Sequence, residues 1–537
     1  MSSIQCWRNI LDKYLAVIFA VAFAASSSNA LARVTGDPLQ IEGGKVEGQW
    51  AQNTEVKAYL VIPYAAPPVG ELRWAEPGPV VPWSGVRKAD KQPAMCMQTL
   101  RTPGTISIEV YGNQNLPMSE DCLHLNVWAP ADASSSSKLP VFVWIHGGAF
   151  TSGSAAKPEF NGERLAKRGI IVVSINYRLN IFGYFAHPDL TAQSPNHSSG
   201  NYGALDQVAA LKWVEKNISS FGGDPSKVTI GGQSAGSTSV NNLMASPLAR
   251  GLIDGALAQS GGVAATQTKT LKAAEDEGRK FTDMLGDQSI KDLRAMPAEV
   301  VLSLWSDTKT RFAGPVVDGY FLKKSVGDVW AAGEQAQVPY LVGWSRDEFY
   351  ENIYNRTEDE FVKQAAREVG QERVAEMRTL YGVKDNATAT AARVGFSRDA
   401  NFGLNTWNAA SNQAKGKSPT YLYYWTRLSP FWEGQSFQEN SPASLLGAYH
   451  GSQVPYVFGT LDVLDREFTA RDRELSSLWQ AYIANFVETG NPNGTGLPEW
   501  PTFDNTAEKV LEIGDKTTVV DLPNKPQMNF FRKMVKN

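Results

Sequence analysis

Residues 230–237 read IGGQSAGS, in which an apolar run ends and Ser234 stands between Gly232 and Gly236. The residues before it, KVTIGG, are typical of a buried strand, and AGSTSVNNLMAS after it can begin a helix. A tight strand-to-helix turn strains the serine backbone and brings chain segments together, so only small residues fit two positions away. The stretch therefore predicts a turn that presents the Ser234 hydroxyl at the positive end of a helix dipole.

Similar apolar runs alternate with helix-like segments along the chain. PVFVWIHGG, GIIVVSINY, SKVTIGG and VPYLVGW are typical of strands buried on both faces of a mainly parallel sheet. Between the second and third runs, apolar residues recur every three or four positions, as one face of a helix requires: Val208, Leu211, Val214 and Ile218. No repeat or clear domain boundary interrupts the pattern. The sequence predicts an α/β fold in one large domain, with helices flanking the sheet.

Composition narrows the possible functions. The chain has 537 residues, of which 42% are hydrophobic, so it can bury a large core. Its 51 Lys and Arg residues against 55 Asp and Glu residues give no basic excess to hold a phosphate backbone. We therefore expect no nucleic-acid partner.

The first 32 residues resemble a cleaved signal peptide. Arg8 and Lys13 precede the apolar run YLAVIFAVAFAA, and Ala30 and Ala32 suit a signal peptidase site. The alternative is a membrane anchor, but a run of about 12 residues is shorter than the roughly 20 that span a bilayer. We expect a mature domain of residues 33–537 that is secreted or periplasmic and lacks a stable membrane anchor.

Cysteine usage agrees with export. Cys6 would leave with the signal peptide, so Cys96 and Cys122 remain as an even pair in a compartment where disulfides persist. We expect them to be bonded, which would stabilise the fold by roughly 3 kcal/mol in the chain-entropy model.

A serine nucleophile needs a base, usually histidine, that a carboxylate orients. In the α/β-hydrolase arrangement the chain order is serine, acid, histidine, and His450 is the only histidine after Ser234. His450 stands in a turn, LLGAYHGSQ, where a loop could present it. For the acid, the strand VPYLVGW is followed by Asp347 and Glu348. The residues alone do not choose between these two carboxylates.

Ester cleavage also needs N–H donors for the oxyanion that forms. HGGAF at 146–150 ends a predicted buried strand with small residues, so its backbone amides can face the site. Gly148 and Ala149, with the N–H of Ala235, could form a three-donor hole. The alternative is a plain Gly-Gly turn.

The chain resembles the type B carboxylesterase and cholinesterase family of α/β hydrolases from about residue 40 to 530. The motifs that carry this resemblance are PPVGELRW, SEDCLHLNVW, HGGAF, NYRL, GNYGALDQ, NISSFGGDPSKVTIGGQSAGS, AQSGG, VPYLVGWSRDE, GAYHGSQVPYVFG and FVETGNPN. The resemblance implies a serine esterase whose catalytic glutamate is Glu348, with Ser260 as a supporting serine.

The resemblance also implies structural pairs: ion pairs of Arg73 with Glu120 and of Arg178 with Asp206, and a disulfide loop from Cys96 to Cys122 at the rim of the active-site gorge. We expect no metal and no cofactor, a small-molecule ester as substrate, and a monomer or weak oligomer.

The departures from the family concern the substrate. Relatives commonly carry glutamate where this chain has Gln233 and Gln453, so two carboxylates are replaced by neutral amides. Residues 97–121 contain no tryptophan, and Tyr111 is their only aromatic residue. A choline cation is held by an aromatic face and negative charge, so we expect no cholinesterase activity. A weaker hypothesis is activity on acidic or polycarboxylate esters.

Two alternatives to a soluble esterase stay open. A lipase has a long flap over an apolar tunnel, whereas the loop of residues 97–121 is short for a lid. A non-catalytic binding protein of this family typically lacks the serine or histidine, which are both present here. Several aromatic residues are candidates either for the pocket walls or for the core: Trp344, Phe349, Phe402, Trp407, Trp425, Phe431 and Trp432.

Overall fold

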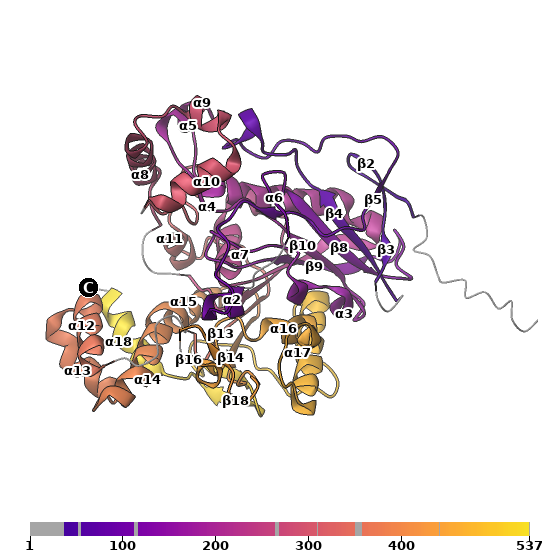
Figure 1. Cartoon of the computed structure of the whole chain (residues 1–537). Coiled ribbons are helices and arrows are strands. Elements are labelled where there is room, and N and C mark those ends of the chain that lie inside the picture. Colours follow the sequence, from indigo (N-terminus) through magenta and orange to yellow (C-terminus); the bar gives the residue numbers. More distant parts are fainter. Residues whose placement is uncertain are drawn as a thin grey trace, which may run out of the picture.

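An eleven-stranded mixed sheet runs through the centre of the computed structural model (Figure 1). The structure describes residues 37–51, 55–111, 116–263, 268–308, 310–348, 357–439 and 441–535. In spatial order, the strands are β18 (Thr517–Asp521), β17 (Lys509–Ile513), β14 (Thr420–Trp425), β13 (Tyr340–Ser345), β12 (Gly255–Gln259), β11 (Gly223–Gln233), β9 (Leu139–Ile145), β10 (Ile171–Ile175), β8 (His124–Pro130), β4 (Val56–Pro63) and β3 (Gln49–Trp50).

The middle of this sheet is parallel. Every neighbouring pair from β10 to β17 runs parallel, whereas the strands at the two edges pair antiparallel with their neighbours. The four apolar runs that predicted buried strands correspond to β9, β10, β11 and β13. The prediction of a mostly parallel sheet in an α/β fold is confirmed.

Alternate residues of β9 serve two cores, one on each face of the sheet. Val141 and Val143 pack in the larger core with α6 (Tyr202–Asn217) and α7 (Ala235–Ala245). Phe142 and Trp144 pack in the second core with α3 (Glu163–Ala166), α16 (Val454–Phe458) and α17 (Ala470–Thr489). Figure 1 shows α6 and α3 on opposite sides of these strands. The unbroken apolar runs follow directly from burial on both faces.

The helix predicted before β11 is present. It is α6, continued by a 3₁₀ turn over Ile218–Phe221. The apolar residues that predicted its buried face are all at most 3% exposed: Val208, Leu211, Val214 and Ile218.

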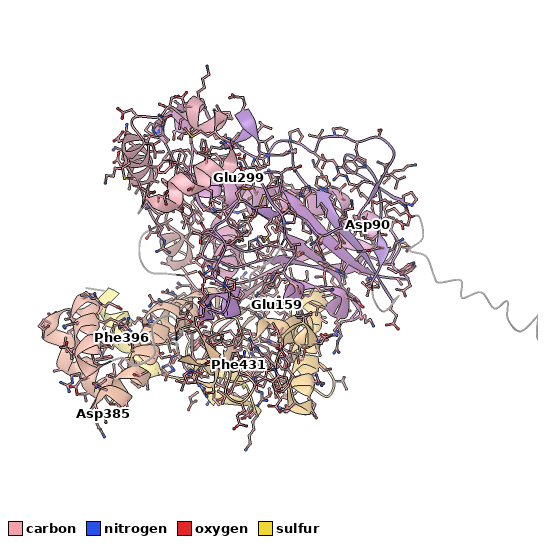
Figure 2. The ribbon with its side chains drawn as sticks, viewed as in Figure 1. Asp90, Glu159, Glu299, Asp385, Phe396 and Phe431 are labelled. Atoms are coloured by element: carbon pink, nitrogen blue, oxygen red, sulfur yellow. A yellow bond between two sulfur atoms is a disulfide. The ribbon has the colours of Figure 1, made fainter. Side chains whose placement is uncertain are left out.

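A group of helices lies to one side of β13 and β14, at the lower left of Figure 1. It contains α12 (Glu358–Val369), α13 (Val374–Leu380), α14 (Asn386–Ser397) and α18 (Lys525–Val535). Phe396 of α14, labelled in Figure 2, packs against Phe361 and Phe531 at ring-centroid distances of 6.3 and 5.3 Å. This aromatic cluster ties the C-terminal helix to α12 and α14.

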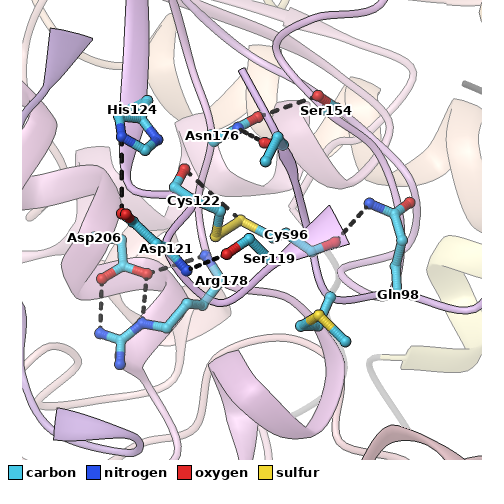
Figure 3. The surroundings of a disulfide bond; sticks show 12 residues. Cys96, Gln98, Ser119, Asp121, Cys122, His124, Ser154, Asn176, Arg178 and Asp206 are labelled. Atoms are coloured by element: carbon cyan, nitrogen blue, oxygen red, sulfur yellow. Dashed lines mark hydrogen bonds and ion pairs between the residues drawn. A yellow bond between two sulfur atoms is a disulfide. The ribbon is translucent and has the colours of Figure 1, made fainter. Parts of the chain in front are cut away.

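Cys96 and Cys122 form a disulfide with an S–S distance of 2.06 Å, as predicted (Figure 3). Arg178 lies near it and pairs with Asp206 through two hydrogen bonds of 2.7 and 2.8 Å. The other expected ion pair, between Arg73 and Glu120, is also present. The predicted signal peptide, residues 1–32, lies outside the described residues. Within those residues, every helix is too short or too polar to cross a bilayer.

Candidate active site

Ser234 occupies the predicted turn between β11 and α7, with a φ of 58°. A Cβ added to Gly232 would lie 2.4 Å from the carbonyl carbon of Gly236, and one added to Gly236 would lie 2.0 Å from the carbonyl oxygen of Ile145. Both distances are shorter than atoms tolerate. The two glycines are therefore required by the close approach of this turn to the end of β9.

His450 and Glu348 meet beside this turn although 102 residues separate them. Nδ1 of His450 lies 2.5 Å from Oε2 of Glu348, and the other carboxylate oxygen accepts a 2.6 Å hydrogen bond from the N–H of Ser345. His450 and Glu348 are 3% and 1% exposed. The carboxylate can thus hold the imidazole in the tautomer with a proton on Nδ1.

Asp347, the other candidate acid, faces a different group. Its Oδ2 accepts a 2.8 Å hydrogen bond from the N–H of Ala448 and pairs with Arg346. It therefore shapes the backbone of the turn that carries His450. The structure places Glu348, rather than Asp347, on the imidazole.

The remaining ring nitrogen of His450 contacts Gln233. Its Nε2 lies 3.0 Å from Nε2 of Gln233, so the carboxamide donates and the imidazole accepts. Within the described part of the chain, no hydrogen bond joins His450 to Oγ of Ser234. The amide of Gln233 thus takes the position at Nε2 that a serine nucleophile needs, and catalytic hydrogen bonds often tighten only when substrate binds.

The turn after β9 carries the other predicted donors. Gly148, Ala149 and Phe150 all have positive φ, and a Cβ on Gly148 would lie 2.0 Å from the carbonyl oxygen of Ser152. The N–H groups of Gly148, Ala149 and Ala235 donate to no acceptor among the described residues. These amides are available to an oxygen of a ligand.

His146 begins this turn and is held as a neutral ring. It is 1% exposed, and its ring stacks on Tyr177 at a centroid distance of 4.5 Å. Burial lowers the pKa of His146 to about 4, against the opposing effect of a hydrogen bond to Gly147. The hydroxyl of Tyr177 donates to the carbonyl of His146 at 2.9 Å. This histidine therefore supports the backbone of the turn.

The segment between the disulfide cysteines braces the same turn. The side chain of Gln98 accepts from the N–H of Gly153 and donates to its carbonyl, both at 2.9 Å. Asn180 donates to the carbonyls of Met97 and Thr151, at 2.7 and 3.3 Å. The disulfide therefore fixes a segment that holds the candidate oxyanion donors in place.

Ser260 and Gln453 are fully buried and form a polar network next to Ser345 and Glu348. The amide of Gln453 donates to Oγ of Ser260 at 3.3 Å, and its carbonyl accepts from the hydroxyl of Ser345 at 3.2 Å. Of the two glutamines singled out in the sequence, Gln233 lines a cavity beside the site, whereas Gln453 contacts Ser345, whose N–H donates to Glu348.

Two cavities adjoin these residues. The larger, about 410 Å³, is lined by Ser234, Ala149, Ala235 and Ser260. The smaller, about 40 Å³, is lined by Gln233, by Gly451 next to the histidine, and by the ion pair of Lys157 with Glu159. The candidate nucleophile and two of its candidate oxyanion donors thus share one cavity.

The aromatic candidates divide between wall and core. Phe402 lines the larger cavity and lies 5.0 Å from the ring of His450. Trp344, Trp407 and Trp425 are at most 1% exposed and belong to the core. Phe349 lies outside the described residues.

Several polar residues of the larger cavity were missed in the sequence, among them Asn242 and Arg311. No motif or periodicity identifies Arg311, which stands in a loop, and Asn242 is hidden within the helix that follows Ser234. Among the described residues, no group of three or more His, Cys, Asp and Glu side chains is placed to hold a metal ion.

Comparison with known proteins identifies the family of this chain. The model of a family described as the carboxylesterase family matches residues 36–531. The chain is 34% identical over 526 residues to cocaine esterase of Homo sapiens, which covers 92% of this chain and 90% of that protein. It is also 34% identical over 505 residues to fumonisin B1 esterase of Sphingopyxis macrogoltabida, which covers 90% and 88%.

Among solved structures, PNB esterase superposes with a TM-score of 0.76 at 30% sequence identity. The match covers 92% of this chain and 99% of that one. The similarity extends over almost the whole chain, including all the elements that bring the site together.

Proposed function

Because this chain belongs to the carboxylesterase family of α/β hydrolases, we propose that it cleaves carboxylic esters through an acyl intermediate on Ser234. It is a carboxylic ester hydrolase by family, and the proposal concerns which residues act and on what. The observation that carries it is the placement of Ser234 on the turn between β11 and α7, in a cavity that Ala149 and Ala235 also line.

In the first step, His450 takes the proton of Ser234 as Oγ attacks the ester carbonyl. Nε2 of His450 must first exchange its hydrogen bond to Gln233 for one to Ser234, because an acceptor with one lone pair serves one donor at a time. Glu348 keeps the proton on Nδ1 and stabilises the imidazolium that forms. Gln233 therefore occupies Nε2 of His450 until the base contacts Ser234.

The negative charge of the tetrahedral intermediate develops on the former carbonyl oxygen. The N–H groups of Gly148, Ala149 and Ala235 bind it, and the backbone of the turn fixes them before substrate arrives. His450 then gives its proton to the leaving alcohol. Water repeats the sequence on the acyl enzyme and releases the acid.

The cavities support a substrate other than choline esters. Lys157 lines the smaller cavity, and its ammonium group pairs with the carboxylate of Glu159 at 2.7 Å. The neutral Gln233 stands where relatives commonly carry a carboxylate. A quaternary ammonium would meet no unpaired negative charge among the described lining residues, which argues against cholinesterase activity.

A second part of the proposal is that the site accepts acidic or polycarboxylate esters. The relatives carry names as different as cocaine esterase and fumonisin B1 esterase, so family membership does not select a substrate. A neutral amide at Gln233 removes a charge that would repel an anionic ester. We further propose export to the outside of the cell or the periplasm, with the mature domain beginning after residue 32, on the strength of the N-terminal sequence.

A hydrolysis panel tests the proposal. The full chain is assayed with 4-nitrophenyl esters from acetate to palmitate, and with acetylcholine beside its uncharged isostere, 3,3-dimethylbutyl acetate. We expect turnover of short and medium chains, no preference for acetylcholine, and a loss of kcat by a factor of at least about 10⁴ in Ser234→Ala.

The matched control is Ser226→Ala, which removes an exposed serine hydroxyl eight positions before Ser234. It should retain wild-type activity. Equal activity in wild type and Ser234→Ala would reject the acyl-serine mechanism, and a preference for palmitate over all shorter esters would favour the lipase alternative. A folded wild type without any turnover would favour a binding protein.

A further inference from the structure

We propose that Arg311 and Asn242 bind a free carboxylate of the acyl group, so that the enzyme prefers esters in which a dicarboxylic or higher acid supplies the acyl part. This inference rests on the proposed esterase function and adds to it the class of acid. It is carried by the charge and hydrogen-bonding groups of the cavity of about 410 Å³ beside Ser234.

The acyl group of the intermediate adjoins this cavity. After the alcohol leaves, the acyl carbon is bonded to Oγ of Ser234, and its oxygen lies on the N–H groups of Ala149 and Ala235. Ser234, Ala149 and Ala235 line the larger cavity, whereas the third donor, Gly148, lines the smaller cavity together with Gln233 and Gly451. Because Gln233 contacts His450, which protonates the leaving oxygen, we place the alcohol at the smaller cavity and the acyl chain at the larger one.

Arg311 is the only ionisable residue among the described residues that line the larger cavity. Arg311 is an exposed residue at the edge of the cavity; its backbone N–H donates to Glu277 at 2.9 Å, and its guanidinium forms no ion pair within the described part of the chain. A guanidinium presents a planar fork of donors that matches a carboxylate. This cation therefore has its charge available to a ligand.

Asn242 supplies a second, independent observation. It is 5% exposed, it lines the same cavity, and its Nδ2 has no hydrogen-bond partner. A buried amide without a partner is costly, and such groups in native proteins usually meet a water or a ligand. A carboxylate oxygen would satisfy this donor.

The distance from Ser234 to Asn242 determines how long the acyl chain must be. Asn242 follows Ser234 by eight residues along α7, which is about 12 Å along the helix axis. A free carboxylate that contacts Asn242 lies at the far end of a long acyl chain, so suberate should show the effect more strongly than glutarate. Acetate-like acyl groups would leave both Arg311 and Asn242 without a partner.

No described residue that lines this cavity carries a negative charge. Apart from Arg311 the lining residues are neutral: glycines, alanines, apolar side chains, hydroxyls and amides. An acid with free carboxylates therefore gains a cation without meeting a like charge, and a neutral acyl chain gains nothing from Arg311.

The test compares esters matched in length. Mono-4-nitrophenyl esters of glutarate, adipate and suberate are assayed against 4-nitrophenyl pentanoate, hexanoate and octanoate, with wild type and Arg311→Gln. We expect Arg311→Gln to lower kcat/KM for the anionic esters about 10- to 100-fold, mainly through KM, with little change for the neutral esters. Asn242→Asp, which places a carboxylate in the cavity, should act in the same direction.

Arg250→Gln is the matched control, since it removes an exposed arginine outside the cavity. It should change neither series. The inference is overturned when Arg311→Gln changes both series equally or leaves both unchanged, and the neutral series shows at once that the variant is folded.

A binding measurement separates this inference from the proposed function. Calorimetric titration of glutarate and suberate into wild type and Arg311→Gln needs no turnover. Weaker binding to the variant supports the carboxylate site even when no ester is cleaved. Hydrolysis of the neutral esters with equal diacid binding to both proteins would retain the esterase and reject the carboxylate site.

Discussion

Gln233 sits at the junction of the catalytic base and the smaller cavity. A carboxamide can donate to a neutral imidazole, which keeps Nε2 an acceptor and leaves no negative charge beside the ring. A carboxylate at this position could not donate that hydrogen bond and would instead stabilise the protonated imidazole. Among the described residues, Glu348 is therefore the carboxylate that contacts the imidazole.

Gln233→Glu should accordingly move the acid limb of the kcat/KM profile to higher pH. The base must be neutral to accept the serine proton, so a nearby carboxylate that stabilises its charged form should raise the midpoint by about one pH unit. The measurement is a pH profile with a neutral 4-nitrophenyl ester.

Gln371→Glu makes the same change at an exposed position of the short helix Gln371–Arg373 and serves as the control. Its profile should coincide with that of the wild type. A Gln233→Glu profile with an unchanged acid limb would show that this side chain does not act on the base.

At the scale of elements, the turn between β11 and α7 has no spare room. The carbonyl of Ile145, at the end of β9, lies where a Cβ of residue 236 would stand. Both partners are backbone atoms of central elements, so neither can move without disturbing the sheet or the candidate oxyanion turn that follows β9. Gly236 is therefore a structural requirement of the site.

Gly236→Ala should destabilise the protein by about 3 kcal/mol or more and abolish esterase activity. The physical cause is the 2.0 Å approach of the new Cβ to the Ile145 oxygen. Thermal unfolding and hydrolysis of a short-chain ester measure the two effects. Gly78→Ala is the control, because its Cβ would lie 3.5 Å from the nearest atom, Cβ of Ala66. Wild-type stability in Gly236→Ala would contradict the described geometry.

The sequence predicted features that depend on neighbouring residues, but not contacts between residues far apart in the chain. The turn at Ser234 and the strands around it were predictable because local periodicity and small residues determine them. The choice of Glu348 over Asp347, two neighbours in sequence, depends on which side chain meets a turn 102 residues away. The contact of Gln233 with His450 spans 217 residues, and Arg311 reaches the cavity from an unpatterned loop. Such contacts leave no local signal.

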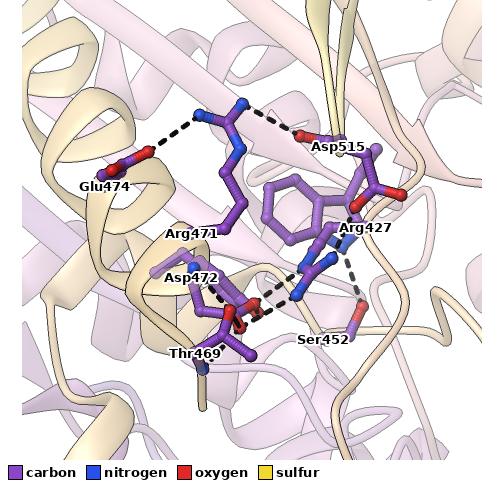
Figure 4. Close-up of polar contacts among 10 residues, drawn as sticks. Arg427, Ser452, Thr469, Arg471, Asp472, Glu474 and Asp515 are labelled. Carbon is purple, nitrogen blue, oxygen red and sulfur yellow. Dashed lines mark hydrogen bonds and ion pairs between the residues drawn. The ribbon is translucent and has the colours of Figure 1, made fainter.

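Across the whole molecule, the sheet is joined to its covering helix by a buried ion pair. Arg427 follows β14, and Asp472 lies in the first turn of α17; they share hydrogen bonds of 2.7 and 2.9 Å (Figure 4). Asp472 also accepts from the hydroxyl of Tyr456 at 2.7 Å and from the N–H of Thr469 at 2.9 Å. Its carboxylate is fully buried and therefore depends on these partners.

Ionisation of Asp472 links this contact to pH. Burial opposes the charged form, but the hydrogen bonds from Arg427, Thr469 and Tyr456 outweigh it and lower the pKa from the usual 3.8 to about 2. A carboxylate with a lowered pKa in the folded state stabilises that state above its unfolded pKa. This contribution is lost as the pH falls from about 4 towards about 2.

Asp472→Asn should lower the free energy of unfolding by about 3 kcal/mol at neutral pH, because it leaves the Arg427 guanidinium without its buried counter-charge. Urea unfolding from neutral to acidic pH measures the difference, which should shrink as the wild-type carboxylate becomes protonated. Asp515→Asn is the matched control: Asp515 pairs with the same arginine, but its side chain is 76% exposed, so the loss should stay below about 1 kcal/mol. Equal losses in the two variants, or a difference that does not depend on pH, would show that the junction between β14 and α17 relies on packing rather than on this ion pair.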